Sequence, residues 1–411
     1  MKSTAKKKWV LFTNIFICSH VLFSHIYAAN YLDRLLYEAC LWVKPVGTIP
    51  TNNKPTEIAQ VSLFKKNPVL ANKLHYVSLG DLPTPLKKCK KLGKSIGVSD
   101  FYIKDDGQIN SSFGGNHVRK LEFLLADACA NSAKTVISTI DVKAYSVLAL
   151  TLCAQQLNMK TIAILSGDEN SESIRNNLLA TVYYGAEIHY HPSALFQDTA
   201  ALNLFLEFER RNSYYPYIMP AGLSNELSAI AYVNAAFELK DQITAGVMPE
   251  PDYIFVPVGT MSTAAGLILG LAAAGLKSKV VCARVDVRAE EQALYFLIQS
   301  TQKLLESLDP TFIASVSKDS VKINSDFYKD TDALSKQVAQ DIALLQRLDS
   351  ITLDPLYSGK AFSTCLSEIN KNKLQNNVIL FWNTYSQLDY SRILQSVTYR
   401  KLPASLQGFF L

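Results

Sequence analysis

FGGNHVRKLEF, residues 113–123, places two glycines and an asparagine directly before a helical pattern. The glycines permit the tight turn that has to precede the helix, and apolar residues recur with helical spacing from Val118 onward. Asn116 can cap the free amide groups of the first turn. The stretch therefore predicts a turn that enters a helix, with His117 held at the positive end, where active-site groups are often displayed.

Short apolar runs alternate with helical windows along the chain from Leu82 onward. Strands that are apolar throughout and alternate with helices indicate mostly parallel sheets covered by helices on both faces. The sequence therefore predicts an α/β fold. The predicted strands span residues 135–140, 160–165, 186–190, 253–258, 279–285 and 377–382. The predicted helices lie near residues 116–130, 144–157, 171–184, 195–211, 225–243, 263–275, 289–307, 333–347 and 358–371.

The first 29 residues have the layout of a secretory signal peptide. Lys2 and Lys6–Lys8 precede an apolar run over residues 9–29 that ends in two alanines. Polar residues inside the run, among them Asn14, would be costly in the middle of a bilayer. We expect cleavage near Ala28 or Ala29 and export to the periplasm or out of the cell, with no stable membrane span afterwards. An uncleaved anchor over residues 9–29 is the second interpretation, and an ordinary cytoplasmic N-terminus is the third.

The charge of the chain argues against a nucleic-acid partner. The formal net charge is +5, and the four N-terminal lysines supply four of these charges. Nucleic-acid binding is driven by clustered Lys and Arg side chains against phosphate, and the nearly neutral remainder offers no such excess.

Neither a metal site nor a disulfide framework is predicted. His189 and His191 share one face of a predicted strand, but two ligands without a third do not make a metal site. The cysteines that remain after cleavage are far apart and show no CxxC spacing, which favours buried free thiols, although an oxidising compartment would permit some pairing. These cysteines are Cys40, Cys89, Cys129, Cys153, Cys282 and Cys365.

Two loops that follow predicted strands are expected to contribute to a ligand site. In open sheets, ligands bind at the C-terminal ends of strands, and anions bind at helix N-termini. DVKAYS, residues 141–146, and GTMSTAAGL, residues 259–267, both connect a predicted strand to a predicted helix. In the second loop Thr260, Ser262 and Thr263 supply hydroxyl groups, although Ser or Thr at a helix start is more often a cap.

Five motifs occur in an order and spacing that resemble the 1-aminocyclopropane-1-carboxylate deaminase and D-cysteine desulfhydrase family. They are LGDLPTPL (79–86), YIKDDG (102–107), FGGNHVRKLEFLLADA (113–128), MPAGLSNELSAIAYVNAAFEL (219–239) and LDPLYSGKA (353–361). The resemblance implies a pyridoxal-phosphate enzyme of fold type II, the two-lobed tryptophan-synthase-β-like fold, and a possible homodimer. The implied large lobe spans residues 76–120 and 229–405, and the small lobe spans residues 121–228.

The same resemblance shows where this sequence departs from the family. His117 stands where the family has the lysine whose amine forms the Schiff base with the cofactor, and an imidazole has no primary amine. IDVKAYS, residues 140–146, replaces a loop of the Gly-Gly-Val-Gln-Ser-Asn-His type, and residues 384–386 replace a Thr-Gly-Gly beside the pyridine ring. Met261 and Ser262 replace two glycines of the phosphate loop, which penalises positive φ there.

Three residues are candidate catalytic groups. His117 could act as a general base, Lys143 could supply a relocated amine, and Tyr357 matches the family's active-site tyrosine. Each also has a structural interpretation, as a pocket-lining histidine, an exposed loop lysine and a packing tyrosine. Lys120 is interpreted as structural, because family members carry a lysine there beside the catalytic one. The candidate cofactor-binding residues are Asn116, Gly259, Thr260, Met261, Ser262, Thr263 and Thr384.

Three functions are compatible with these residues. The first is an exported homologue that has lost Schiff-base catalysis and keeps a cleft for a small amino-acid-like or phosphate ligand. The second is an active pyridoxal-phosphate deaminase or desulfhydrase that uses Lys143. The third is an interaction protein that uses the fold as a scaffold. Its partner contact would be residues 30–75, an extension that includes the linker-like segment KPVGTIPTNNKPTE (44–57).

Overall fold

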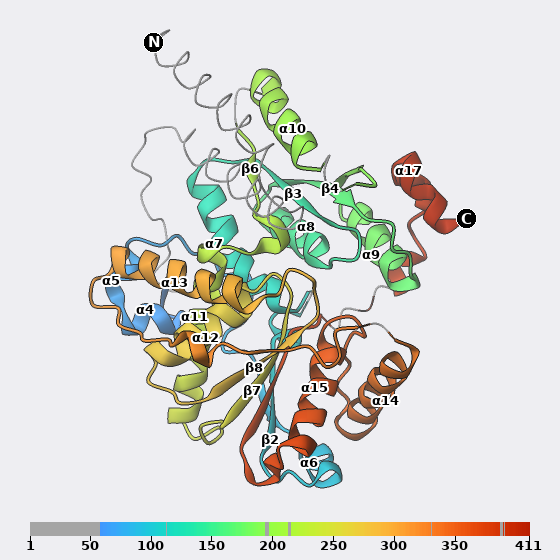
Figure 1. The fold of residues 1–411 in the computed structure, drawn as a ribbon. Coiled ribbons are helices and arrows are strands. Elements are labelled where there is room, and N and C mark those ends of the chain that lie inside the picture. The colour runs from blue at the N-terminus through green and yellow to red at the C-terminus, as the bar shows by residue number, and fades with distance from the viewer. Residues whose placement is uncertain are drawn as a thin grey trace.

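The computed structural model describes residues 58–411, apart from residues 112, 194–196, 213–214, 330, 387–388 and 390. The predicted signal peptide, residues 1–29, and the predicted extension as far as residue 57 lie outside the described residues. The described chain forms two lobes, each built on one sheet (Figure 1).

The larger lobe is built on a six-stranded sheet with the order β1-β2-β10-β7-β8-β9. Neighbouring strands run parallel, except that β1 and β2 pair antiparallel. Alternate residues enter two cores: Ile254 and Val256 of β7 pack on one face of the sheet, and Phe255 packs on the other. The strands are β1 (Leu86–Lys88), β2 (Phe101–Asp105), β7 (Tyr253–Val258), β8 (Lys279–Arg284), β9 (Ile323–Asn324) and β10 (Ile379–Asn383).

Helices cover both faces of this sheet (Figure 1). One core contains residues of α11, α12 and α13, and the other contains residues of α6, α14 and α15. These helices are α6 (Lys90–Ile96), α11 (Glu226–Thr244), α12 (Ser262–Ala273), α13 (Glu291–Leu308), α14 (Asp332–Asp349) and α15 (Ser358–Lys371). Short 3₁₀ turns connect several elements: Asp106–Gln108, Ala221–Leu223, Lys318–Ser320, Leu374–Asn376, Tyr399–Lys401 and Gly408–Phe410.

The smaller lobe is built on a four-stranded parallel sheet with the order β5-β4-β3-β6. Its strands are β3 (Thr135–Asp141), β4 (Lys160–Ser166), β5 (Glu187–Tyr190) and β6 (Tyr217–Ile218). Its helices are α8 (Ser146–Gln156), α9 (Glu172–Tyr183) and α10 (Gln197–Asn212). The helix α7 (Asn116–Ala130) contributes to the cores of both lobes, through Phe123 in the large lobe and Leu124 in the small lobe.

The predicted α/β fold with mostly parallel sheets is confirmed. The helix predicted over residues 116–130 coincides with α7, and the six predicted strands match β3, β4, β5, β7, β8 and β10 within two residues at each end. Sequence periodicity missed β1, β6 and β9 because they are only two or three residues long. It missed β2 because Lys104 and Asp105 look like exposed residues, yet both are buried.

Segments at both ends of the described chain pack where the sequence did not place them. Residues of α4 (Ser62–Lys66) and α5 (Pro68–Ala71) enter the core of the large lobe, although they fall in the predicted extension. At the other end, α16 (Ser391–Leu394) is followed by α17 (Ala404–Gln407). Leu402 and Leu406 pack against the small lobe, whereas the predicted large lobe extends to residue 405.

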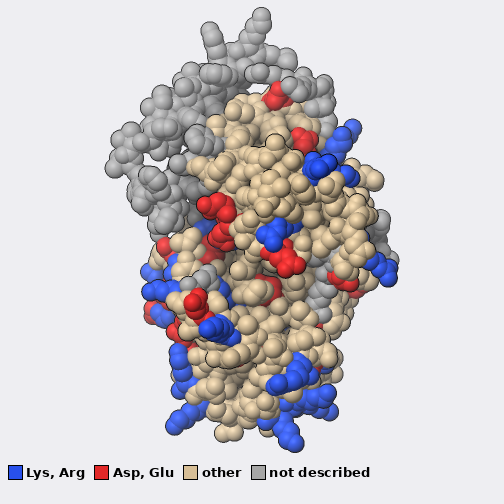
Figure 2. Space-filling view, turned by 90° about the vertical axis from the view of Figure 1, so that its right-hand side faces the viewer, with Lys and Arg blue, Asp and Glu red and all other residues tan. Residues whose placement is uncertain are grey.

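The surface mixes charges of both signs. On the face in Figure 2, basic side chains lie in separate groups with acidic ones between them, and uncharged or apolar residues cover most of the area. None of the helices in the described part of the chain is long and apolar enough to span a bilayer. The five described cysteines are unpaired, and all except Cys129 are buried, as the sequence predicted for most of them.

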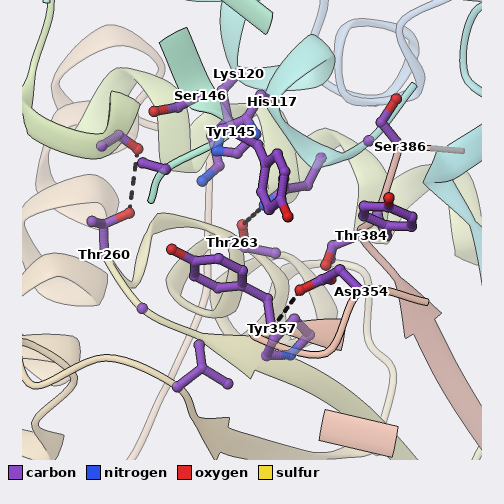
Figure 3. A pocket seen from close by; sticks show the side chains of 18 of the residues that line it. His117, Lys120, Tyr145, Ser146, Thr260, Thr263, Asp354, Tyr357, Thr384 and Ser386 are labelled. Atoms are coloured by element: carbon purple, nitrogen blue, oxygen red, sulfur yellow. Dashed lines mark hydrogen bonds between the residues drawn. The ribbon is translucent and has the colours of Figure 1, made fainter. Parts of the chain in front are cut away.

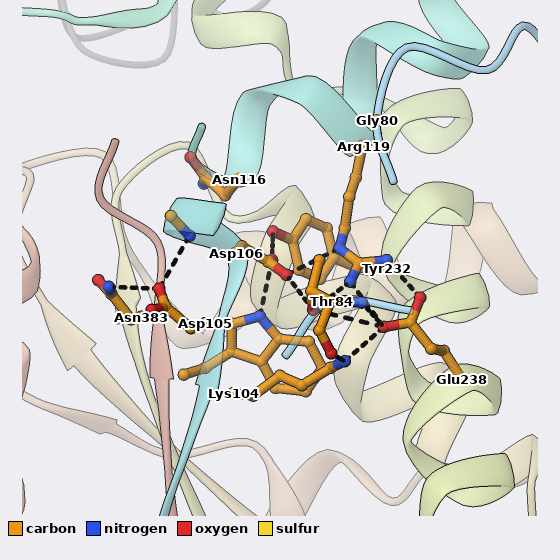
Figure 4. A network of polar contacts seen from close by, with 12 residues as sticks. Gly80, Thr84, Lys104, Asp105, Asp106, Asn116, Arg119, Tyr232, Glu238 and Asn383 are labelled. Carbon is orange, nitrogen blue, oxygen red and sulfur yellow. Dashed lines mark hydrogen bonds and ion pairs between the residues drawn. The ribbon is translucent and has the colours of Figure 1, made fainter. Parts of the chain in front are cut away.

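A buried network of charged side chains joins β2, α7 and α11 (Figure 4). Arg119 Nε donates to Asp106 at 3.0 Å, and the two terminal nitrogens of Arg119 donate to the Glu238 carboxylate at 3.0 and 2.9 Å. Lys104 Nζ also donates to Glu238, at 2.5 Å. These side chains are at most 4 % exposed. Two cations therefore neutralise two anions away from water.

Neutral donors complete this network. Asp106 Oδ2 accepts hydrogen bonds from the hydroxyl of Tyr232 at 2.7 Å and from the indole nitrogen of Trp382 at 2.8 Å, which adds β10 to the connected elements. Burial alone would raise the pKa of Glu238, but the charges of Arg119 and Lys104 outweigh it and hold that pKa at about 2. Glu238 is thus charged, and both carboxylates are paired with buried cations, which is the condition under which buried charge is tolerated.

Two glycines set the position of α7 above this network. A side-chain carbon at Gly114 would lie 1.9 Å from the carbonyl oxygen of Gly107, so no other residue fits there. Gly115 has a φ of 97°, in the left-handed region, and its amide donates to the carbonyl oxygen of Asp106 at 2.8 Å. The predicted tight turn is therefore present, and it holds the first turn of α7 beside the end of β2.

We expect the Arg119→Met substitution to lower the free energy of unfolding by about 3–5 kcal/mol, because it leaves the buried Asp106 without its cation and Glu238 with Lys104 as its remaining cation. Denaturant titration followed by circular dichroism measures this loss. Arg347→Met, on the exposed face of α14, is the matched control and should change the value by at most about 0.5 kcal/mol. Equal effects of the two substitutions would contradict the role given to the network.

Candidate functional site

A cavity of about 110 Å³ lies between the two lobes, where three long helices begin. The helices α7, α8 and α12 begin at Asn116, Ser146 and Ser262. Asn116, Ser146 and Thr263, all in these first turns, line the cavity (Figure 3). The positive ends of three helix dipoles therefore face one small volume.

The residues at the cap positions of these three helices supply no capping side chain. These residues are Gly115, Tyr145 and Met261, and no side chain of theirs accepts a hydrogen bond from a first-turn amide. By contrast, α9, α11 and α14, which begin elsewhere, each have a capping side chain. Asn116, which was expected to cap α7, is instead its first residue and donates through its side chain to Thr263 Oγ1 at 3.2 Å. Uncapped first turns are suited to an anion.

Lys120 is a buried cation in the wall of this cavity. It is 2 % exposed, and burial lowers the pKa of its ammonium group to about 7. No acidic side chain in the described chain forms an ion pair or hydrogen bond with it. The two acids that line the cavity are already engaged: Asp286 pairs with Arg288 at 2.8 and 2.9 Å, and Asp354 accepts the backbone amides of residues 356–358. The cavity therefore holds an amine that is partly charged at neutral pH and whose charged form has no acidic partner among the described residues.

His117 lies beside Lys120 and is partly exposed to the cavity. Burial, together with the charge of Lys120, lowers the pKa of His117 to about 3. Its imidazole is therefore neutral at physiological pH and is a weak base. The structure thus supports the pocket-lining interpretation of His117 better than the general-base interpretation.

Three tyrosines from both lobes meet in the cavity. The ring of Tyr145, from the small lobe, packs edge-to-face against Tyr357 and Tyr385 of the large lobe, with centroids 6.3 and 6.2 Å apart. Burial raises the pKa of all three phenols, that of Tyr385 to about 12, so they stay protonated at neutral pH. Tyr357 can donate a proton in this state but is not a base. The cavity is small beside pockets of about 300–1,000 Å³ because these rings occupy part of the cleft.

The backbone of the loop before α12 is strained at Met261, one of the two positions at which the sequence predicted a penalty for positive φ. Met261 has a φ of 73°, which a residue with a side chain adopts at a cost of about 1 kcal/mol. The amide of Ser262 donates to Ser224 Oγ at 3.2 Å, and the hydroxyl of Ser262 is buried without a hydrogen-bond partner. The hydroxyl of Ser146 at the start of α8 is likewise buried and unpartnered. Of these two hydroxyl-bearing residues, Ser146 lines the cavity, so unused hydrogen-bonding capacity lies in the cavity wall at Ser146.

Lys143 does not line the cavity. Its Nζ lies 2.6 Å from Glu169, on the partly exposed side of the small lobe. Burial opposes the charge, but the hydrogen bond that Lys143 donates to Glu169 raises the pKa of Lys143. A lysine that is charged and paired outside the cavity is poorly placed to act as the relocated amine.

Most of the predicted site residues meet in the cavity. Ser262 and Lys143 are the exceptions, because Ser262 turns into the protein behind the loop. Sequence reasoning missed Lys120 and Tyr145 as cavity residues. One signal could have indicated that Lys120 faces the cavity: it lies three residues from His117 on the same helix, and residues with this spacing are neighbours. The predicted residues that line the cavity are Asn116, His117, Gly259, Thr260, Met261, Thr263, Tyr357 and Thr384.

No group of three His, Cys, Asp or Glu side chains in the described residues could hold a metal ion. His189 lies 2.7 Å from Glu187 at the surface, and no third ligand joins His189 and His191. The arrangement at the cavity therefore provides hydroxyl, amide and amine groups, which are donors to an anion.

Comparisons with known proteins give one family. A family model described as pyridoxal-phosphate dependent enzyme matches residues 77–384. D-cysteine desulfhydrase of Yersinia enterocolitica is 30 % identical over 73 % of this chain and 90 % of its own length. The mitochondrial bifunctional D-cysteine desulfhydrase/1-aminocyclopropane-1-carboxylate deaminase of Arabidopsis thaliana is 29 % identical over 75 % of this chain and 78 % of its own.

Solved structures agree with these matches. The crystal structure of an ACC deaminase homologue has a TM-score of 0.65 and 27 % identity, and the match covers 82 % of this chain and 99 % of that one. A threonine deaminase from Solanum lycopersicum, with a TM-score of 0.54 and 15 % identity over 84 % of this chain and 89 % of its own, has the same fold.

We expect Lys120→Met to raise the free energy of unfolding of the ligand-free protein at pH 7 by up to a few kcal/mol, since it removes a buried group that resists charging. The pKa of Lys120 is about 7 in the folded protein and 10.5 ordinarily. The unfolded chain therefore binds more protons between these values, and Lys120 makes stability rise with pH over that range. Denaturant titrations at pH values from 6 to 10 measure this dependence. The free energy of unfolding of the variant should rise less with pH than that of the wild-type protein.

Lys143→Met is the control for this measurement. Its ion pair with Glu169 is partly exposed, and such pairs contribute at most about 1 kcal/mol. If Lys120→Met destabilises the free protein at pH 7, Lys120 makes stabilising contacts and is not an uncompensated cation.

Proposed function

The chain belongs to the pyridoxal-phosphate dependent enzyme family, as its motifs indicated, and we propose that its cleft binds pyridoxal phosphate or a small anionic ligand like it, with no covalent bond at position 117. One observation carries this proposal: Lys120, a buried amine with no acidic partner among the described residues, lines a cavity that the N-termini of three helices also face. Both features favour a bound anion.

The residues present fit the phosphate of the family's cofactor. Thr263 and Asn116 line the cavity at the first turns of α12 and α7, and the Thr263 hydroxyl and the second amide hydrogen of Asn116 are donors that would hold the phosphate. The hydroxyl of Thr260, in the loop before α12, already donates to the carbonyl oxygen of Gly222. The hydroxyl of Ser146 is a further donor without a partner. A ligand of cofactor size also needs the ring of Tyr145 to turn aside, because this ring packs across the cavity.

Pyridoxal phosphate, when bound, supplies an electron sink for reactions at the α-carbon of amino acids. This chain supplies protonated phenols at Tyr145, Tyr357 and Tyr385, and a neutral imidazole at His117. These groups can donate hydrogen bonds or a proton to a ligand in the cavity. His117 has no amine with which to bind the cofactor covalently, which supports loss of the family's chemistry at this position.

Small amino acids are the substrate class that the names of the relatives indicate, and the proposal extends this class to the present chain. The carboxylate of an amino acid is an anion that the same helix N-termini would attract. The use of Lys143 as the relocated amine has less support, because that side chain is paired with Glu169 outside the cavity. The hypothesis of an interaction protein that uses the fold as a scaffold has no support from residues 58–75, because residues of this segment pack into the large lobe.

We expect Ser146→Ala to weaken ligand binding without destabilising the free protein. The buried hydroxyl has no partner, so its removal leaves the free protein unchanged or more stable by about 1 kcal/mol. The loss of a donor to an anion should lower the affinity about 10- to 150-fold, because a hydrogen bond to a charged group contributes about 1.5–3 kcal/mol. Thermal stability is measured against the concentration of pyridoxine 5′-phosphate, which has the ring and phosphate of the cofactor but no aldehyde.

Ser278→Ala is the matched control, since Ser278 also has a buried, unpartnered hydroxyl but lies between α12 and β8, away from the cavity. Binding should be unchanged in this variant. Inorganic phosphate alone and phosphate-free pyridoxine are tested alongside, to separate the contributions of the phosphate and the ring. If neither phosphate nor pyridoxine 5′-phosphate stabilises the wild-type protein, the proposal fails.

Export of the protein belongs to the same proposal and is supported by the basic and apolar pattern of residues 1–29. We expect N-terminal sequencing of the protein from its natural cells to begin at Ala29 or Asn30. A mature chain that retains Met1 and fractionates with the cytoplasm would overturn this part of the proposal.

A further inference from the structure

Lys120 presents its amine to the same cavity that the family's lysine at position 117 would face. The two positions are three residues apart on α7, so their side chains are neighbours on one helix face. Figure 3 shows Lys120 and His117 side by side in the cavity wall, and both line it. The amine at position 120 is thus displaced from the family's position by about one helical turn.

Among the described residues, Lys120 is the only lysine that lines the cavity. Other lysines near the cleft are held by partners. Lys143 is paired with Glu169 at 2.6 Å, and Lys104 donates to Glu238 and to the carbonyl oxygen of Thr84 at 2.7 Å. Lys120 has no such acceptor, and its burial keeps water from competing for the amine.

We propose that Nζ of Lys120 forms the covalent bond to the aldehyde carbon of pyridoxal phosphate that the family forms through position 117. This inference rests on the proposed function, because it requires the cofactor in the cavity. It extends that function by naming the reacting atom, and it revises both the interpretation of Lys120 as structural and the suggestion of Lys143 as the relocated amine.

The bond forms by condensation. The lone pair of the neutral amine attacks the aldehyde carbon, a carbon–nitrogen double bond replaces the carbon–oxygen bond, and the oxygen leaves as water with the two hydrogens of the amine. No electrons are gained or lost overall, so no oxidant or reductant is needed. Burial favours the neutral amine, since it lowers the pKa of Lys120 to about 7, whereas the pKa of Lys143 is raised.

The neighbours of Lys120 suit this step. The imidazole of His117 is neutral, and its N–H can donate a hydrogen bond to the departing oxygen. The buried acids Asp286 and Asp354 are occupied by Arg288 and by backbone amides, so neither holds Lys120 in its protonated form. The site therefore presents a free amine.

The test is to incubate the purified protein with pyridoxal phosphate, reduce it with borohydride and map the modified peptide by mass spectrometry. Reduction converts the carbon–nitrogen double bond into a stable secondary amine, so the label records which lysine reacted. We expect close to one label per chain, on Lys120. Lys143→Met should keep the label, and both Lys120→Met and Lys120→Arg should lose it. The absorbance of the complex in the visible range, measured before reduction, should disappear in the same two variants.

Binding of pyridoxine 5′-phosphate separates the failure of this inference from failure of the proposed function. If this aldehyde-free compound stabilises the wild-type protein, but the label falls on Lys143 or is spread over surface lysines, the assignment to Lys120 is wrong and the proposed function stands. If Lys120→Arg retains a stoichiometric label, the assignment is likewise wrong. If neither compound stabilises the protein and no label forms, both are wrong.

Discussion

The pairing of Arg119 with Asp106 and Glu238 holds three elements of the structure against one another in a region buried from solvent. Arg119 is on α7, Asp106 follows β2, and Glu238 is on α11. Because an unpaired buried charge is very unfavourable, α7 cannot shift along its axis without losing these bonds. The first turn of α7, with His117 and Lys120, is therefore fixed in its position beside the starts of α8 and α12. The geometry of the cavity depends on this network more than on the residues that line it.

The cavity itself is less favourable for the free protein than a well-packed core would be. Lys120 is buried without a counter-ion, Ser146 has an unused hydroxyl, and Met261 has a strained backbone. Each of these features lowers stability, and all three lie within one cleft. Protein interiors avoid such groups unless something else compensates for them. A bound anion would compensate for the charge and for the hydroxyl, so the same features that weaken the free protein favour the complex.

Much of the fold could be predicted from the sequence, but less of the site. The helix at residues 116–130 and the six longer strands follow from periodicity, and the loop before α12 follows from its place after a buried strand. The position of Lys120 does not, because Arg119, Lys120 and Glu122 look like the solvated side of an amphipathic helix, whereas α7 is buried on almost all sides. The placement of Lys143 depends on Glu169, a residue 26 positions away whose proximity is set by the small sheet. Local pattern carries no information about such contacts.

The contact of Tyr145 with Tyr357 and Tyr385 has a consequence for the time course of binding. Two edge-to-face ring contacts contribute about 1–3 kcal/mol. Since 1.4 kcal/mol corresponds to a factor of ten, the form in which both contacts are broken makes up roughly 1–15 % of the molecules. We consider the case in which a cofactor-sized ligand enters only this open form. The observed association rate and the apparent affinity are multiplied by that fraction, so both fall to about 1–15 % of their values for an open cleft. Rings that close again behind a ligand would also delay its release. Contacts among three aromatic side chains from the two lobes would therefore slow the exchange of ligand.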